Sequence, residues 1–475
     1  MSLEDRLAQA GQGHLAEALA RLDGAERERL GEQVEALDLD LIGRLVGDLV
    51  GAGGPPELGR IEPLAPEDVI RLPRSEADRE RERAAAAAGA EALAGGRVAA
   101  VLLAGGQGTR LGFDGPKGAF PFAPITGRSL FAHHAAKVAA LRDRYAAPIP
   151  WYVLTSPQND GETRAFFAEH DHFGLDPASV RFVVQGTLPA VDREDGAILL
   201  EAPDRLALSP DGHGGLLSAL RASGALDEMD AAGVTTIFTF QVDNPLLPVC
   251  RPDVIGHHVQ AGADMSSMVV RKLGPEERMG VIARVDGRTG VVEYSDLPDE
   301  LADRRDDDGE LAFWAGSIAV HCVEVAFVRQ LTEGGLRLPY HRALKRVPHL
   351  DDAGRAVDPD EPNAVKFETF LFDALPSARR SVTIEARRED TFSPIKNAEG
   401  PDSPATARRD LNRLYARWLE AAGVGVPRDG DGEPVDLEID PRFALDAEEL
   451  AEVLPLGFRV EGPTVLRLSP PAASP

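Results

Sequence analysis

The middle of the chain alternates between two patterns of apolar positions. Val98–Leu103 is apolar at every position, which is typical of a strand buried on both faces of a parallel sheet. In residues 130–145 the apolar side chains instead recur at helical spacing, which predicts an amphipathic helix. Further strands are predicted at residues 151–156, 180–186 and 235–244. Strands that alternate with helices predict an α/β fold, with a mostly parallel sheet and helices on both faces.

The first 95 residues follow the helical pattern alone. Segments 15–22, 31–37 and 41–50 place Leu, Val and Ile at helical spacing, before a Gly/Pro-rich stretch that starts at Gly51. Ser75 is then placed to cap another helix, which is rich in alanine. We therefore predict a helical N-terminal region over residues 1–95.

The end of the chain differs again from the α/β pattern. A helix is predicted over residues 410–423, followed by short strands separated by Pro, Gly and Asp. The final residues, SPPAASP, have the composition of a disordered tail. The sequence thus predicts an α/β domain over residues 96–405 and a small α+β domain over residues 406–475.

A glycine-rich run follows the first α/β strand. Residues 98–117 read VAAVLLAGGQGTRLGFDGPK, and Gly105 and Gly106 allow a tight turn and a close approach to a ligand. Arg110 and Lys117 come next. Exposed backbone N–H groups, a guanidinium and an ammonium together can hold a phosphate group.

Spacing excludes two familiar phosphate-binding loops. The run lacks the GxxxxGK[ST] pattern of a P-loop. It also lacks a GxGxxG fingerprint that opens a helix, because Pro116 follows the glycines. The loop is therefore of another phosphate-binding type.

Two more charged residues are candidates for the same site. Asp243 ends the apolar segment IFTFQV, at the sheet edge where ligands bind in such folds. Its carboxylate could hold Mg²⁺ that bridges phosphate oxygens, or it could cap the next turn. Lys396 lies in SPIKNA, where Pro394 favours an extended chain and a fixed reach.

Composition limits the possible partners. The 475 residues carry a formal net charge of −27, which predicts no nucleic acid partner and no anionic membrane surface. The two cysteines, Cys250 and Cys322, have no CxxC spacing, so neither a disulfide framework nor a zinc site is predicted. With no signal peptide and no long apolar run, we expect a cytoplasmic protein. The choice between monomer and homo-oligomer stays open.

The chain resembles the UDP-sugar pyrophosphorylases, and among them the branch of eukaryotic-type UDP-N-acetylglucosamine pyrophosphorylases. The resemblance covers roughly residues 8–415 and follows the family's order of motifs. Besides LAGGxGTRLG…PK, the matching strings are IPWYVLTS, FGL, QGTLPA, PDGHGG, VDN, GAD, VVEYSD, KFETFLFD, REDTFSPIKNA and PATAR.

The resemblance implies a fold and a reaction. The fold is a Rossmann-like nucleotide-diphospho-sugar transferase (GT-A-like) mixed sheet, with residues 96–405 as the catalytic domain. The reaction is UTP:sugar-1-phosphate uridylyl transfer, making UDP-N-acetylglucosamine and pyrophosphate from UTP and N-acetylglucosamine-1-phosphate. The implied partners are UTP and a hexose-1-phosphate, with Mg²⁺ or another divalent cation as cofactor. Because the attacking phosphate is ionised at neutral pH, no general base is needed.

The resemblance also implies roles for individual residues. The catalytic residues would be Arg110, Lys117, Asp243 and Lys396, with Asp243 as the metal ligand. The nucleotide-binding residues would be Gly105, Gly106, Gln185, Gly212 and His213. The sugar-binding residues would be Gly280, Glu293, Ser317, Phe370 and Phe372, where the two phenylalanines could equally be core residues of a strand.

Three positions depart from the branch. His213 replaces an asparagine after the PDG glycine, and Trp314 and Ser317 stand where the branch has asparagines. GHG is similar to the glucose-type and broad-specificity enzymes, so a UTP–glucose-1-phosphate or broad-specificity UDP-sugar pyrophosphorylase is an alternative. A catalytically inactive sugar-nucleotide-binding scaffold is a second alternative, against which the retention of Arg110, Lys117, Asp243 and Lys396 argues.

Overall fold

The computed structural model describes residues 2–50, 59–351 and 353–468, and it divides the chain into two compact units. The first unit consists of Met1–Glu57, Gln185–Ala219 and Gly335–Asp373. The second unit consists of Leu58–Val184, Leu220–Gly334 and Ala374–Pro475. The predicted SPPAASP tail and most of the Gly/Pro-rich stretch after Gly51 lie outside the described residues. The division into three parts at residues 95 and 405 stays a prediction.

A mixed sheet is the centre of the second unit, with strand order β2-β20-β12-β15-β11-β3-β4-β5. Strands β11, β3, β4 and β5 are parallel neighbours, whereas β15 runs antiparallel to β11 and β12. In chain order these strands are β2 (Val69–Ile70), β3 (Val98–Leu103), β4 (Trp151–Thr155), β5 (Val180–Val184), β11 (Thr236–Gln241), β12 (Met265–Arg271), β15 (Ala315–Glu324) and β20 (Ser381–Glu385). Strands β1 (Ile61–Glu62), β13 (Val281–Val285) and β14 (Arg288–Val292) extend it beside β15.

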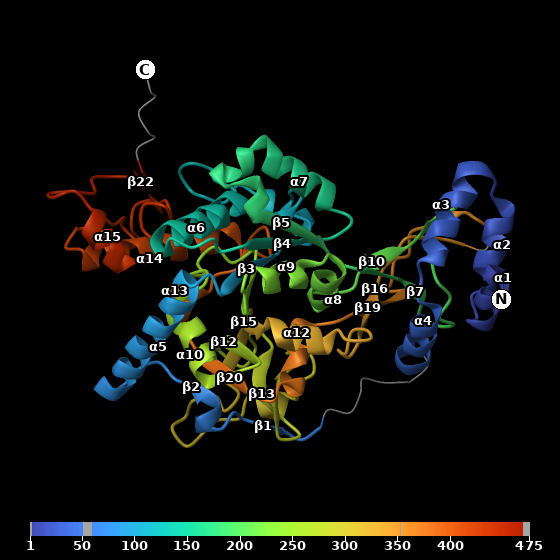
Figure 1. Cartoon of the computed structure of the whole chain (residues 1–475), viewed down its shortest axis with the longest axis horizontal. Helices are drawn as coiled ribbons and strands as arrows, with labels where there is room; N and C mark the ends of the chain where they lie inside the picture. Colours follow the sequence, from blue (N-terminus) through green and yellow to red (C-terminus); the bar gives the residue numbers. More distant parts are fainter. Residues whose placement is uncertain (1, 51–58, 352, 469–475) are drawn as a thin grey trace. The chain divides into compact units, whose positions relative to one another are not determined.

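Helices flank this sheet, as Figure 1 shows. They are α5 (Glu76–Ala94), α6 (Leu130–Tyr145), α7 (Asp160–Glu169), α9 (Ala225–Ala231), α10 (Pro252–Ala261), α11 (Asp299–Ala302), α12 (Val325–Leu331) and α13 (Arg388–Thr391). Every residue of β3 is buried, and Val98 and Leu102 share one apolar core with Leu130 and Val138 of α6. The prediction of a mixed α/β sheet between helices is confirmed.

The C-terminal part of the second unit is a small α+β structure, as predicted. Helix α14 (Pro404–Ala421) begins at the N-cap Ser403, whose side chain forms a capping box with Thr406. Strands β21 (Leu437–Ile439) and β22 (Thr464–Leu466) pair in parallel, and α15 (Ala447–Val453) lies between them in sequence.

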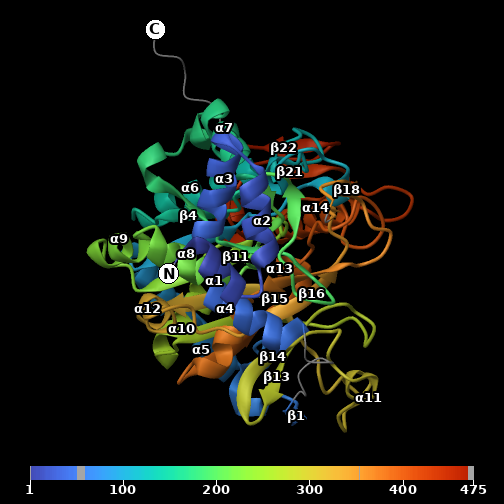
Figure 2. The same ribbon diagram turned by 90° about the vertical axis from the view of Figure 1, so that its right-hand side faces the viewer.

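The first unit combines N-terminal helices with short antiparallel strands. Helices α1 (Leu3–Gln9), α2 (Gly13–Arg21), α3 (Gly24–Glu35) and α4 (Leu39–Leu45) follow the helical prediction, and α1, α2 and α3 lie side by side in Figure 2. The region predicted as helical over residues 1–95 also contains the strands β1 and β2, which pair with β13 and β20 of the large sheet. The strands are β6 (Thr187–Pro189), β7 (Val191–Asp192), β8 (Leu200–Ala202), β9 (Arg205–Leu206), β10 (Leu208–Pro210), β16 (His341–Lys345), β17 (His349–Leu350), β18 (Ala356–Val357) and β19 (Ala364–Glu368). Leu15, Leu30, Val191 and Phe367 belong to one buried core, which joins the helices to the strands.

Within the residues placed by the structure, no helix combines the length and the apolar character needed to cross a membrane.

Helices α5 and α10 approach closely because each has a glycine at the contact. A Cβ atom on Gly256 would lie 1.7 Å from the carbonyl oxygen of Ala85, and one on Gly89 would lie 1.8 Å from that of Pro252. Both partners are backbone atoms, which cannot rotate away as a side chain could. The backbones of the two helices must therefore separate if either glycine gains a side chain.

We predict that Gly256→Ala lowers the free energy of unfolding by about 1–3 kcal/mol, the usual cost of overpacking. Gly161→Ala in α7 is the matched control, because nothing lies within 4 Å of its Cβ position. Alanine is the better helix former there, by up to about 1 kcal/mol. Urea unfolding followed by circular dichroism measures both changes. Equal midpoints for Gly256→Ala and the wild type would contradict the close helix contact.

Candidate active site

The glycine-rich loop after β3 is folded back on itself by main-chain hydrogen bonds. The N–H of Gly108 donates to the carbonyl oxygen of Gly115 at 2.9 Å, and the N–H of Lys117 donates to that of Gly106 at 3.1 Å. Within the described residues, the N–H groups of Gly105 and Gly106 have no acceptor. The loop is therefore held in place while two of its donors stay available to an anion.

A buried asparagine fixes the start of this loop. Asn159, at the N-terminus of α7, donates from Nδ2 to the carbonyl oxygen of Ala104 at 2.9 Å and to that of Gly106 at 3.3 Å. Its Oδ1 accepts from the N–H of Ser156 at 2.8 Å. Asn159 is fully buried, so these bonds are shielded from water.

Asp243 reaches the same edge of the sheet from β11. Because β11 pairs in parallel with β3, the N–H of Val242 donates to the carbonyl oxygen of Leu103 at 3.1 Å. The Asp243 carboxylate lies 3.1 Å from the Lys117 ammonium, and each side chain is 17% exposed. The structure thus brings together Lys117 and Asp243, which the sequence analysis gave as candidates for the same site.

The segment before Lys396 is attached to Asp243. The N–H of Ile395 donates to the Asp243 carbonyl oxygen at 2.8 Å. The Asn244 amide donates to the carbonyl oxygen of Thr391 at 2.8 Å and accepts from the N–H of Ser393 at 3.2 Å. Asn244 therefore joins the two segments that carry Asp243 and Lys396.

The other two predicted cations are more accessible. The Lys396 ammonium is 3.6 Å from Asp402, and both side chains are more than 40% exposed. Arg110 is exposed, and in the described part of the chain it has no ion-pair partner. Both side chains are accessible to an anion in solvent.

Three predicted sugar-binding residues meet at one end of β13. The N–H of Ser317 donates to the Gly280 carbonyl oxygen at 2.8 Å. A Cβ on Gly280 would lie 3.0 Å from a carboxylate oxygen of Glu293, so this side chain crosses the glycine. Nearby in sequence, Trp314 is buried, with the Arg71 guanidinium 3.9 Å from its ring centre. That cation–π contact gives Trp314 a packing role.

The predicted residues Gln185, Gly212, His213, Phe370 and Phe372 lie in the first unit. Gly212 has φ +84°, and a Cβ there would lie 2.3 Å from the carbonyl oxygen of Thr369. Only glycine fits this close approach in a left-handed conformation.

His213 forms an aromatic cluster with the two phenylalanines. Its ring centre is 5.3 Å from that of Phe370 and 5.5 Å from that of Phe372. Its Nδ1 accepts from the N–H of Leu371 at 3.1 Å. Burial lowers the pKa of His213 to about 4, so the ring is neutral at physiological pH.

Asp211 has a notable environment that the sequence analysis did not single out. Cβ atoms on Gly186 and Gly215 would lie 2.6 Å and 2.0 Å from its carboxylate oxygens, so this carboxylate fills the space that the glycines leave. Burial raises the pKa of Asp211 to about 7, and a hydrogen bond from Gln185 opposes the rise. A lone acidic residue inside the glycine-rich PDGHGG string is the signal that could have found it.

Helix α6 contains a second set of overlooked residues. His133, His134 and Lys137 are buried on a helix that packs against the core. His133 and Lys137 are four positions apart, so they share a helix face. The signal that could have found them is the presence of basic residues, four positions apart, within the apolar part of the predicted helix.

No group of three or more His, Cys, Asp or Glu side chains among the described residues could hold a metal ion by itself. Asp243 offers one carboxylate at the mouth of the glycine-rich loop. Mg²⁺ commonly uses one or two carboxylates together with substrate phosphates and water, so a single carboxylate fits such an ion.

Strand β3 ends in a glycine-rich loop, and Lys117 and Asp243 are paired at the carboxyl edge of the sheet, an arrangement that fits a nucleotidyltransferase. Residues 59–400 match the family model described as UTP–glucose-1-phosphate uridylyltransferase, and the chain belongs to this family.

Individual proteins with similar sequences or structures are pyrophosphorylases by name. The chain is 38% identical to UDP-N-acetylhexosamine pyrophosphorylase-like protein 1 of Homo sapiens, over 97% of this chain and 96% of that protein. It is 36% identical to UDP-N-acetylglucosamine pyrophosphorylase of Saccharomyces cerevisiae, over 77% of each chain. The crystal structure of the uridine diphosphate N-acetylglucosamine pyrophosphorylase from Trypanosoma brucei in complex with inhibitor matches with TM-score 0.80. That match has 28% identity and covers 98% of this chain and 99% of that one.

The environment of His134 predicts a pH dependence of stability. Its Nε2 donates to the carbonyl oxygen of Val242 at 3.0 Å, while its buried Nδ1 has no partner among the described residues. Burial lowers the pKa of His134 from 6.5 to about 3, with the nearby Lys137 as a smaller cause. Between these values the unfolded chain binds a proton that the folded chain does not. Stability from the neutral ring is therefore complete above pH 6.5 and is lost as the pH falls toward 3.

We predict that His134→Gln flattens this dependence by up to about 1.4 kcal/mol per pH unit. The free energy of unfolding is measured in urea at pH 7, 6 and 5 for the wild type, for His134→Gln and for the exposed control His170→Gln. Parallel curves for the wild type and His134→Gln would contradict a buried neutral ring.

Proposed function

We propose that the protein transfers the uridylyl group of UTP to N-acetylglucosamine-1-phosphate, which yields UDP-N-acetylglucosamine and pyrophosphate. The observation that carries the proposal is the Lys117–Asp243 pair, 3.1 Å apart beside the glycine-rich loop. The pyrophosphorylase names of the Homo sapiens and Saccharomyces cerevisiae relatives support this choice of reaction. Both cysteines are buried and free, which fits the reducing cytoplasm where we place the enzyme.

The reaction requires charge neutralisation more than proton transfer. A phosphate oxygen of the sugar-1-phosphate attacks the α-phosphorus of UTP, and the bond from that phosphorus to the bridging oxygen of the β-phosphate breaks. Pyrophosphate leaves with the electron pair. The nucleophile is already an anion near neutral pH, so the enzyme mainly brings two polyanions together and stabilises the developing charge.

Lys117 is proposed as the principal fixed cation. Its N–H groups point to the carboxylate of Asp243 in the structure, and a phosphate oxygen can take the place of that carboxylate as acceptor. Arg110 in the loop and Lys396 at the end of the 391–396 segment are proposed to bind the phosphates as well, because their side chains are accessible. The free N–H groups of the glycine-rich loop complete the phosphate site.

Asp243 would hold a divalent cation, which when bound withdraws charge from the phosphate oxygens. Its backbone is fixed on one side by the pairing of β11 with β3 and on the other by Ile395. Binding of a metal–nucleotide complex would then give Asp243 a new cation and Lys117 a new anion. Each charge of the ion pair would thus keep a partner of opposite charge when the substrate is bound.

Nucleotide and sugar recognition are proposed for the remaining predicted residues. Gln185 and the Gly212 backbone offer amide and peptide groups for the uracil edge, and Asp211 would fix the Gln185 amide. Glu293 would accept hydrogen bonds from sugar hydroxyl groups beside Gly280 and Ser317. The glucose-type alternative stays open because Trp314 and Ser317 cannot supply the two amides that they replace, and because His213 gives the GHG string of the glucose-type enzymes.

The test is pyrophosphate release from UTP with a panel of sugar-1-phosphates. We predict release with N-acetylglucosamine-1-phosphate, and a preference over glucose-1-phosphate of only about tenfold in kcat/KM, because the amides that would read the acetamido group are missing. Lys117→Met, purified in parallel, controls for contaminating enzymes, since loss of a charge that acts on the transition state costs about a hundred- to thousandfold.

Two results would overturn the proposal. Strict use of glucose-1-phosphate would establish the glucose-type alternative. No release with any sugar, from a protein that still binds UDP-sugars, would favour the inactive scaffold.

A further inference from the structure

Three basic side chains of α6 donate hydrogen bonds to the main chain on both sides of Asp243. Their acceptors are carbonyl oxygens, so each contact fixes the backbone and not a rotatable side chain. The contacts are His134 Nε2 to Val242 at 3.0 Å, His133 Nε2 to Pro245 at 3.1 Å, and Lys137 Nζ to Pro245 at 2.5 Å and to Leu247 at 2.8 Å.

Lys137 is the unusual member of this set. Its side chain is 7% exposed, and it has no carboxylate partner in the part of the chain that the structure describes. A buried lysine in such surroundings needs other acceptors, and the two carbonyl oxygens are the ones it has. Burial lowers the pKa of Lys137 to about 7, but the ammonium and the neutral amine both carry N–H donors.

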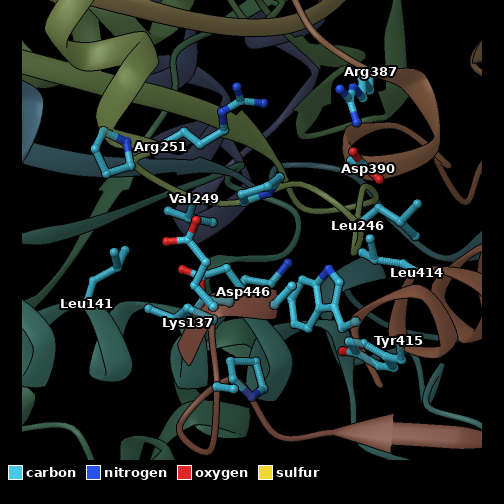
Figure 3. Close-up of a pocket in the computed structure, with 18 of the residues that line it drawn as sticks. Lys137, Leu141, Leu246, Val249, Arg251, Arg387, Asp390, Leu414, Tyr415 and Asp446 are labelled. Carbon is cyan, nitrogen blue, oxygen red and sulfur yellow. The ribbon is translucent and has the colours of Figure 1, made fainter. Parts of the chain in front are cut away.

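The turn that Lys137 holds borders a cavity. Figure 3 shows Lys137 from α6, and Leu246 and Val249 from this turn, on the wall of a cavity of about 680 Å³. Leu414 and Tyr415 of α14 line the same space. Leu246, Leu247 and Val249 are themselves buried in the core, so the hydrogen bonds from α6 act together with side-chain packing to hold the turn.

We propose that Lys137 is a positioning residue for Asp243: its contacts with Pro245 and Leu247 hold the turn that sets the direction of the Asp243 carboxylate. This inference rests on the proposed function, in which Asp243 serves the phosphates. Two elements then hold the backbone around the aspartate: Lys137 of α6 binds Pro245 and Leu247, and Ile395 binds the Asp243 carbonyl oxygen.

The substitution Lys137→Met tests the role, because methionine keeps most of the length and apolar volume of lysine and loses every donor. We predict that kcat for uridylyl transfer falls tenfold to a hundredfold, since small displacements of a reacting group cost about that much. The KM for the sugar-1-phosphate should stay within about twofold, and the Mg²⁺ concentration for half-maximal rate should rise. Lys137→Gln restores two N–H donors on a shorter chain and should fall between the wild type and Lys137→Met.

Hydrogen–deuterium exchange gives a readout that does not depend on activity. In Lys137→Met, amide exchange should rise in peptides covering residues 242–249 and stay unchanged in peptides from β4 and β5. The matched control is Arg142→Met, which lies on the same helix and loses donors to the carbonyl oxygens of Ile149 and Ser179, at 2.9 Å and 3.0 Å. The control should leave exchange at 242–249 and kcat near wild type.

The outcomes separate the inference from the proposed function. An inactive wild type removes the proposed function, while local exchange at 242–249 still reports whether Lys137 holds the turn. Wild-type kcat and unchanged exchange in Lys137→Met would overturn the inference. So would a rise in exchange over the whole sheet, or equal effects of Lys137→Met and Arg142→Met, because either result assigns Lys137 to general stability.

Discussion

The ion pair between Lys117 and Asp243 is the interaction on which the proposed site in the second unit depends. The two residues come from different segments and meet because β3 and β11 are parallel neighbours whose carboxyl ends share an edge. The chain has a formal net charge of −27, so a site for two polyanions needs cations that are held in place locally. The pair supplies one fixed charge of each sign, and the proposed phosphates and divalent cation bring the opposite charges.

The surrounding backbone keeps these charges in position. Asn159 fixes the start of the glycine-rich loop, and Asn244 joins the Asp243 turn to the segment that carries Lys396. His133, His134 and Lys137 hold the same turn from α6. These anchors are buried and bind carbonyl oxygens, whereas Arg110 and Lys396 are exposed. The site thus combines a firmly hydrogen-bonded backbone with two solvent-accessible cations.

Local sequence patterns predicted much of this arrangement. Val98–Leu103 and 235–244 read as buried strands, and the glycine-rich loop and Asp243 follow strands that prove to be neighbours. Local patterns could not predict that β15 enters the sheet antiparallel between β11 and β12, because strand order depends on contacts between distant segments. The same limit applies to the first unit, in which residues 185–219 and 335–373 join the N-terminal helices in one core. His133 and Lys137 were overlooked because an apolar helix gives no sign of which carbonyl groups its basic residues will meet.

The central claim is that a fixed cation and a metal-binding carboxylate at one sheet edge carry out uridylyl transfer. The most direct measurement is the rate of pyrophosphate release from UTP and N-acetylglucosamine-1-phosphate as a function of Mg²⁺ concentration, for the wild type and for Asp243→Asn. This account predicts that EDTA abolishes wild-type activity, that Mg²⁺ restores it, and that Asp243→Asn stays at least about a hundredfold slower at saturating Mg²⁺. Full wild-type activity in EDTA, or an Asp243→Asn enzyme with the wild-type rate and Mg²⁺ dependence, would contradict it.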